Sequence, residues 1–140
     1  MHLAELGIKN GVQCFININS YFNKSNSSYS NLQDYSLSKK SFLIWLQKLS
    51  SKLKIINVFL EHIYGLYDSD SKFVESMIKQ IAIKQVARVE LTHGHQKRDF
   101  VYLDDVVKAY MTLIEYGRDH NFLFKTFELG TGQGTQFVIL

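Results

Sequence analysis

The 140-residue sequence contains no proline, a single cysteine and no long apolar run. Ordinary usage of about 5% would give roughly seven prolines. One cysteine, Cys14, excludes an intramolecular disulfide and any metal site built from several cysteines, so a reducing cytoplasm is the expected compartment. No stretch approaches the roughly 20 apolar residues of a membrane span, and the first residues lack the layout of a signal peptide. We therefore expect a soluble, cytoplasmic protein without a membrane partner.

An excess of charge of one sign is also missing. Sixteen Lys and Arg residues stand against 13 Asp and Glu, a formal net charge of +3. Because the basic residues are scattered, nucleic-acid binding is the least favoured hypothesis. Hydrophobic residues make up 46% of the chain and aromatic residues 14%, which excludes a disordered protein. The length predicts one domain over residues 1–140, with no internal repeat or linker.

The hydrophobic pattern predicts alternating strands and helices. The expected strands are Val12–Ile18, Ile55–Leu60, Val86–Leu91, Phe100–Leu103 and Thr126–Leu129. The expected helices are one stopped by Gly11, one carrying Phe42, Trp45, Leu46, Leu49 and Leu53, one from Phe73 to Ile81, and one from Val106 to Ile114 capped by Asp104 or Asp105. This alternation predicts an α/β fold with a mainly parallel sheet and flanking helices.

The pair Tyr35 and Lys39 carries the clearest chemistry. Their i, i+4 spacing near the start of the longest predicted helix places both side chains on one helix face. An ammonium beside a phenol favours the phenolate, which suits the proton exchange of dehydrogenase chemistry. The spacing alone is weak evidence in a chain with 8 tyrosines, and its structural alternative is an ordinary surface pair.

The segments around this pair strengthen the case. Ser20 ends the strand before the helix, and three further blocks follow in order: His62-Ile63-Tyr64-Gly65, the segment from Gln96 to Val107, and Phe127-Glu128-Leu129-Gly130-Thr131-Gly132. Together they resemble the extended short-chain dehydrogenase/reductase superfamily, in its nucleotide-sugar epimerase/dehydratase branch. The stretches 35–40 and 60–65 are most similar to the CDP-abequose synthase type of O-antigen sugar enzyme.

This resemblance implies a role for each of five residues. NAD or NADP would exchange a hydride with a carbon of a nucleotide-diphosphate sugar. Tyr35 would act as acid and base, and Lys39 would hold the ribose hydroxyls and tune Tyr35. Ser20 would bond the reacting sugar oxygen and Arg98 the diphosphate. His62 stands near the same diphosphate, where the family more often has Asn.

Two departures from the family pattern bear on the reaction. Tyr21-Phe22 replaces the Asp-Glu pair of sugar 4,6-dehydratases, which favours reduction or epimerisation over dehydration. Leu66 replaces the proline of the usual Tyr-Gly-Pro, so the loop loses a φ restraint. The segment 130–134 fails the Gly-x-Gly-x-x-Gly pattern and is expected to be a structural turn. His93 and His95 lack a third ligand, so no metal site is expected.

A glycine-rich turn over a helix N-terminus, which a dinucleotide fold uses for the pyrophosphate, has no counterpart in the sequence. We expect a partial Rossmann-like domain: the C-terminal half of a doubly wound fold plus part of the substrate-binding region. One hypothesis is an enzyme whose N-terminal half comes from another chain or an upstream segment. The expected partners are a nucleotide-diphosphate sugar and either that missing half or further copies of this chain in a homo-oligomer. The alternative is a non-catalytic remnant that at most binds a partner or a nucleotide sugar.

Overall fold

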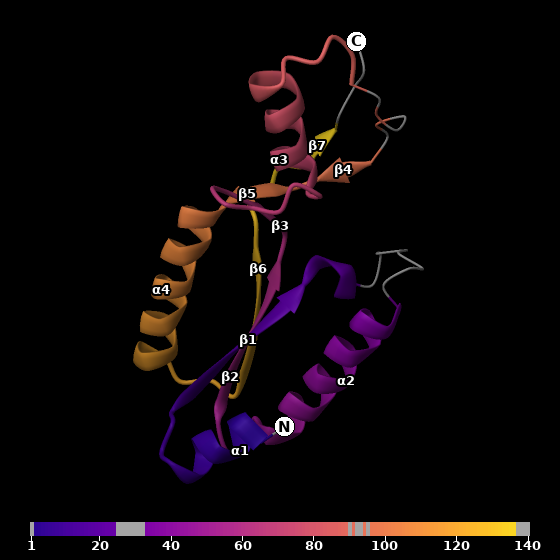
Figure 1. Cartoon of the computed structure of the whole chain (residues 1–140). Helices are drawn as coiled ribbons and strands as arrows, with labels where there is room; N and C mark the ends of the chain where they lie inside the picture. The colour runs from indigo at the N-terminus through magenta and orange to yellow at the C-terminus, as the bar shows by residue number, and fades with distance from the viewer. Residues whose placement is uncertain (1, 25–32, 90, 92–93, 95, 137–140) are drawn as a thin grey trace.

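A three-stranded parallel sheet forms the centre of the protein. The structure, a computed structural model, describes residues 2–24, 33–89, 91, 94 and 96–136. The strands are β1 (Cys14–Ser20), β2 (Lys54–Leu60) and β6 (Phe124–Leu129), in the order β1-β2-β6 (Figure 1). Parallel pairing confirms the predicted α/β class, and these three strands are shifted or extended by one or two residues relative to the prediction.

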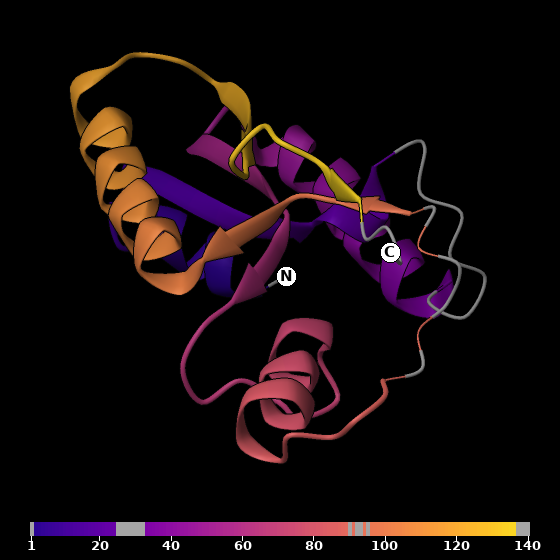
Figure 2. The ribbon, with the colours of Figure 1, turned by 90° about the horizontal axis from the view of Figure 1, so that it is seen from above.

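Helices cover both faces of this sheet. Helix α4 (Leu103–Asp119) lies on one face, whereas α2 (Gln33–Leu49) and the short α1 (His2–Lys9) lie on the other (Figures 1 and 2). Each face therefore has its own apolar core, as a sheet between two helical layers requires. Among the described residues, no helix combines the length and the apolar character that crossing a membrane demands.

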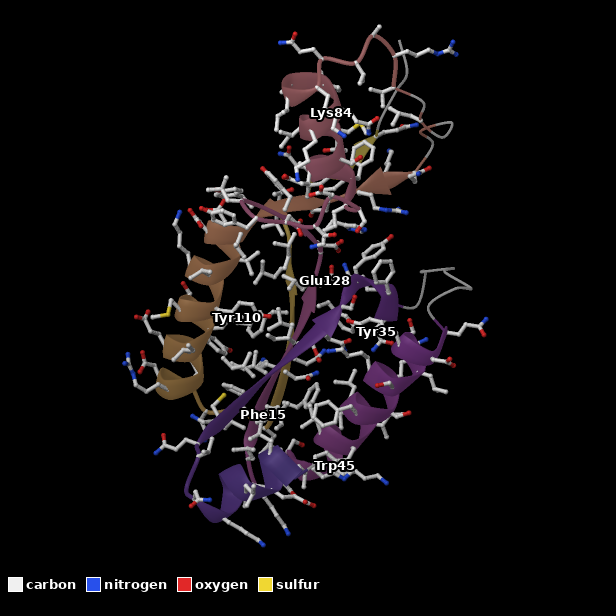
Figure 3. All side chains as sticks on the ribbon, viewed as in Figure 1. Phe15, Tyr35, Trp45, Lys84, Tyr110 and Glu128 are labelled. Carbon is white, nitrogen blue, oxygen red and sulfur yellow. The ribbon has the colours of Figure 1, made fainter. Side chains whose placement is uncertain are left out.

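The two cores follow the alternation of side chains along β2. Ile56 and Val58 are fully buried under α4, and Ile55 is fully buried under α1 and α2. The predicted apolar positions of α2 supply the second core, together with Leu53, which lies beyond the end of the helix but is buried in the same cluster. Figure 3 shows Tyr110 on the inner side of α4, directed toward the sheet.

Smaller elements gather beyond the carboxyl ends of the main strands (Figure 1). They are the 3₁₀ turn η1 (Tyr21–Asn23), β3 (His62–Tyr64) parallel to β5 (Phe100–Tyr102), β4 (Lys97–Arg98) antiparallel to β7 (Thr135–Gln136), and α3 (Phe73–Met77) continuing into the π-helical turn η3 (Ile78–Ile83). This end of the molecule carries most of the candidate site.

Two predictions of local structure are wrong. The described part of the expected strand Val86–Leu91 is irregular, and its residues are exposed except for the half-buried Val89. Residues of suitable composition form a strand only where another strand pairs with them. Gln85 just before this segment has a positive φ of 49°, which turns the chain. The last helix begins at Leu103 with Tyr102 at its N-cap, since β5 runs directly into it. Asp104 and Asp105 lie in the first turn of the helix. There their negative charges interact favourably with the positive end of the helix dipole, and neither residue is the N-cap.

Candidate active site

All five site residues predicted from the sequence line one cavity of about 760 Å³. They are Ser20, Tyr35, Lys39, His62 and Arg98. The cavity lies beyond the carboxyl ends of β1 and β2, which is where open α/β sheets bind their ligands. Residues far apart in the sequence thus share a single space, as the motif order predicts.

Helix α2 presents Tyr35 and Lys39 to the edge of β1. The Lys39 Nζ donates a hydrogen bond of 2.8 Å to the Ile18 carbonyl and lies 5.8 Å from the centroid of the Tyr35 ring. Tyr35 is 45% exposed and projects from the part of α2 nearest the end of β1 (Figure 3). One of the three ammonium donors is used by the strand, and the phenol stays open to a ligand in the cavity.

Ser20 stands where β1 turns into η1. It is the last residue of the strand and the N-cap of the turn, and its Oγ accepts a hydrogen bond from the Phe22 backbone N–H at 3.4 Å. The hydroxyl keeps its own proton for donation, because the bond to Phe22 uses an oxygen lone pair. Ser20 can therefore donate to an oxygen atom in the cavity.

Aromatic rings surround the His62 side chain on the cavity wall. Its ring centroid lies 4.8 Å from that of Tyr21, 6.0 Å from Phe22 and 5.8 Å from Phe100. Burial lowers the pKa of His62 below its ordinary 6.5, although the carboxylates of Glu61 and Asp99 oppose this effect. The neutral imidazole is thus favoured in the folded protein.

Cations flank the same aromatic wall. The Arg98 guanidinium lies 5.9 Å from the Tyr21 ring centroid and the Lys24 ammonium 5.7 Å from it. Both distances are within the range of cation–π attraction. The Tyr21 ring therefore connects Arg98 to His62, and the arrangement suits an anionic ligand with a flat or apolar part.

An ion-pair cluster that the sequence does not reveal braces the site. Lys24 donates to the Glu61 carboxylate and, at 2.9 Å, to Glu128. The Glu61 side chain is only 8% exposed. Burial would lower the pKa of Lys24, but the two carboxylates raise it overall. The cluster ties the segment after β1 to the ends of β2 and β6, and only the position of Glu61 directly after an apolar strand hints at it.

Asp99 fixes the glycine-containing segment after β6. Its carboxylate accepts hydrogen bonds from the Thr131 N–H at 2.9 Å, the Thr131 hydroxyl at 2.6 Å and the Gly132 N–H at 2.8 Å. Burial alone would raise the pKa of Asp99, yet these hydrogen bonds hold it below its usual value. A Cβ on Gly130 would meet the Asp99 carboxylate at 2.5 Å. The segment is a structural loop here, as predicted.

No group of three or more His, Cys, Asp or Glu side chains suited to a metal ion occurs in the part of the chain that the structure describes. His93 and His95, for which a surface loop is expected, lie outside the described residues. The chemistry that the cavity offers is therefore a phenol beside an ammonium, a serine hydroxyl, an imidazole and a guanidinium. These groups suit proton exchange at one end and anion binding at the other.

Comparison with known proteins gives consistent results. The model of the NAD dependent epimerase/dehydratase family matches residues 2–125. The CDP-abequose synthase of Salmonella typhimurium is 33% identical over 136 residues, which are 96% of this chain and 45% of that protein. The chain thus spans about half the length of the curated relatives that it matches.

Solved structures share the fold at low sequence identity. The UDP-N-acetylglucosamine 4-epimerase from Bacillus cereus has a TM-score of 0.78 at 18% identity, over 96% of this chain and 48% of that one. MoeE5 in complex with UDP-glucuronic acid and NAD has a TM-score of 0.75 at 19% identity, with the same coverage. Both confirm the Rossmann-like architecture.

Proposed function

The chain belongs to the NAD dependent epimerase/dehydratase family, and on that premise we propose that residues 1–140 form the catalytic and sugar-binding part of a nucleotide-sugar epimerase or reductase. The observation that carries the proposal is the single cavity shared by Ser20, Tyr35, Lys39, His62 and Arg98. The similarity to CDP-abequose synthases supports a CDP-linked deoxysugar of a surface polysaccharide as substrate.

The proton in this reaction moves at the Tyr35 hydroxyl. Tyr35 gives a proton to, or takes one from, the sugar oxygen at the reacting carbon. The neighbouring Lys39 ammonium stabilises negative charge on the phenol oxygen, and Ser20 donates a hydrogen bond to the same sugar oxygen. NAD or NADP, when bound, accepts or supplies the hydride at the carbon.

His62 and Arg98 bind the anionic part of the substrate. A guanidinium can hold two diphosphate oxygens at once, and an imidazole N–H adds a third donor. The Tyr21 ring lies against both groups, 4.8 Å from the His62 ring centroid and 5.9 Å from the Arg98 guanidinium carbon. The replacement of a family Asp-Glu pair by Tyr21-Phe22 supports reduction or epimerisation over dehydration.

The residues present fit one end of the cofactor. Tyr35 and Lys39 open onto the cavity side by side and offer donors for the two hydroxyls of a ribose. A Gly-x-Gly-x-x-Gly turn for the pyrophosphate does not occur in the sequence. We propose that a glycine-rich half, from another chain or another segment, completes the cofactor site.

Reconstitution tests this function. The chain is mixed with the amino-terminal half of the Salmonella typhimurium CDP-abequose synthase, NAD(P)H and CDP- or UDP-deoxysugars, and the absorbance of reduced nicotinamide is followed. Tyr35→Phe removes the exchangeable proton, so kcat should fall at least about 100-fold. Tyr67→Phe is the control, since Tyr67 is fully exposed and outside the cavity lining.

Turnover that is unaffected by Tyr35→Phe would contradict the proposal, as would a lack of turnover with every cofactor and sugar. A non-catalytic binding protein is the second candidate, supported by His62 and Arg98 in the cavity lining, which can bind an anionic ligand without a cofactor. It predicts that calorimetry detects CDP-sugar binding by the chain alone, weakened by Arg98→Met, while no nicotinamide is consumed under any condition.

A further inference from the structure

In the described part of the protein, the polar residues that are buried as whole residues are all asparagines. The four residues are Asn17, Asn19, Asn23 and Asn57, with exposed fractions between 0% and 6%. Asn17 and Asn57 face each other in register on β1 and β2, and Asn19 follows two residues later on the same face. The three strand asparagines occupy the face of the sheet that α2 covers, between the apolar core and the cavity, and Asn23 lies in η1.

The four carboxamides form one connected hydrogen-bonded chain. The Asn57 Oδ1 accepts from the Asn17 Nδ2 at 2.8 Å and from the Asn19 Nδ2 at 3.2 Å. The Asn19 Oδ1 in turn accepts from the Asn23 Nδ2 at 3.1 Å and from the Ser20 backbone N–H at 2.9 Å. This series of hydrogen bonds thus begins at Asn17 and Asn57 in the middle of the sheet and ends at Ser20 and η1.

This chain is an expensive way to fill a core. The Asn57 Nδ2 is buried and has no hydrogen-bond partner among the described residues. A buried donor left unpaired costs its full desolvation penalty, which an apolar residue of similar size would avoid. The interior of a parallel sheet ordinarily carries Val, Ile or Leu at such positions. Stability alone therefore does not account for the amides.

Their geometry gives them a positional role instead. The Asn19 Oδ1 accepts from Ser20, the N-cap of η1, and from Asn23, the last residue of η1, so it connects the two ends of the turn. The turn contains Tyr21 and Phe22, whose N–H bonds the Ser20 hydroxyl, and all three residues line the cavity. The Asn57 Oδ1 accepts a hydrogen bond from Asn19, and Asn57 itself lies on the central strand β2, which β1 and β6 fix on both sides.

We propose that the buried asparagine chain is a positioning device: Asn57 orients Asn19, and Asn19 fixes the Ser20 hydroxyl and the Tyr21–Phe22 wall of the cavity. Asn19, Asn23 and Asn57 are positioning residues, because they act on a ligand only through this turn. The catalytic role of the Ser20 hydroxyl rests on the proposed function. The positioning of Ser20 and of the turn is a property of the folded protein alone and does not depend on that function.

Two neighbouring amides provide a matched pair of variants. Asn17 and Asn19 lie on one face of one strand, and each donates its Nδ2 to the same Asn57 oxygen. Only Asn19 also accepts from Ser20 and Asn23. Asn17→Ala therefore reproduces the cavity and the lost donor of Asn19→Ala while it leaves the turn closed.

Amide hydrogen exchange of the 140-residue chain, resolved by NMR, decides the proposal. We expect the Ser20 and Phe22 amides to exchange at least tenfold faster in Asn19→Ala than in Asn17→Ala. Equal acceleration in the two variants would overturn the proposal, because the amides would then serve the core only. If Asn19→Ala does not fold, Asn23→Ala takes its place: the Phe22 amide should exchange faster and the Ser20 amide remain protected, and an unchanged Phe22 amide overturns the proposal.

Kinetics of the reconstituted enzyme add a readout that a structural role would not move. Asn19→Ala should lower kcat about tenfold, change KM for the sugar less than twofold, and add no further loss to Ser20→Ala. Equal losses in Asn17→Ala and Asn19→Ala would refute the positioning role while the proposed function stands. Conversely, if no half restores turnover, the proposed function fails and the exchange result still decides the positioning role.

Discussion

At the residue scale, His62 couples the candidate site to pH. Its imidazole is packed among three aromatic rings, and burial lowers its pKa below the 6.5 of an exposed histidine. Between the folded and the unfolded pKa, the unfolded chain binds more protons. The free energy of unfolding therefore decreases as the pH falls below about 6.5, and the loss levels off below the folded pKa.

Replacing this imidazole tests the coupling. In His62→Asn, the urea unfolding free energy should lose this component of its pH dependence between about pH 7 and pH 5, and His62→Gln should behave in the same way. The two carboxylates that act on His62 are those of Glu61 and Asp99, and both remain in the two variants. The difference in unfolding free energy between variant and parent therefore reports the imidazole alone. A parent and variant whose stabilities stay parallel over this range would contradict the prediction.

The sequence predicts the residues of the site better than their support. Tyr35 and Lys39 follow from local helix spacing, and Ser20, His62 and Arg98 from motif order, so all five can be found without long-range contacts. Lys24 and Glu61 are 37 positions apart, and Asn19 and Asn57 are 38 positions apart. Such pairs depend on strand register, which local patterns do not specify.

At the element scale, Gly117 sets how closely α4 approaches the sheet. Alanine in a helix interior is normally more stable than glycine by about 1 kcal/mol. Here, a Cβ on Gly117 would lie 2.8 Å from the Cys14 Sγ and 3.4 Å from the Ile56 Cδ1. We expect Gly117→Ala to lower the urea unfolding free energy by about 1–3 kcal/mol, as overpacked cores do. Fluorescence of Trp45, the single tryptophan, reports the transition.

Two controls separate the clash from helix propensity. Gly7 in α1 has only ordinary contacts, with Val12 atoms from 3.4 Å, so Gly7→Ala should be neutral or stabilising. Cys14→Ala removes the obstructing sulfur and should recover part of the loss when combined with Gly117→Ala. If Gly117→Ala stabilises the protein as Gly7→Ala does, α4 is free to move away from the sheet.

Which elements the sequence predicts depends on how they are stabilised. The strands β1, β2 and β6 and the helices α2 and α4 carry their own apolar patterns, and all five are found within a few residues. The strand expected at 86–91 has a suitable composition, but its described residues pair with no other described strand, whereas β4 has only two residues and exists through pairing with β7. Pairing between distant short segments leaves no periodic signal.

At the scale of the whole molecule, the sheet divides the protein into supporting and functional parts. The apolar core under α4 extends along the sheet as far as Leu129, and the core under α1 and α2 lies toward the amino-terminal end of the strands. The candidate site residues gather beyond the carboxyl ends. Helices on both faces and the parallel order follow from the alternation in the sequence. The cavity cannot be predicted from this alternation. It is enclosed by β3, β4 and α3, whose placement results from contacts outside the main sheet.

The outer edge of β1 leads to the last prediction. In the described sheet β1 pairs with β2 alone, and Ile18 on this edge strand is 52% exposed. Open strand edges pair with other chains, so the 140-residue chain should form oligomers whose size increases with concentration in light scattering. Ile18→Glu, which places a charge on the edge strand, should shift the protein toward the monomer. Leu123→Glu, at a side chain that is 64% exposed and lies away from this edge, should not.

The amino-terminal half of the Salmonella relative should also suppress association, because its strands would cover the edge. A monomer at every concentration, with cooperative unfolding, would show that the edge of β1 needs no cover.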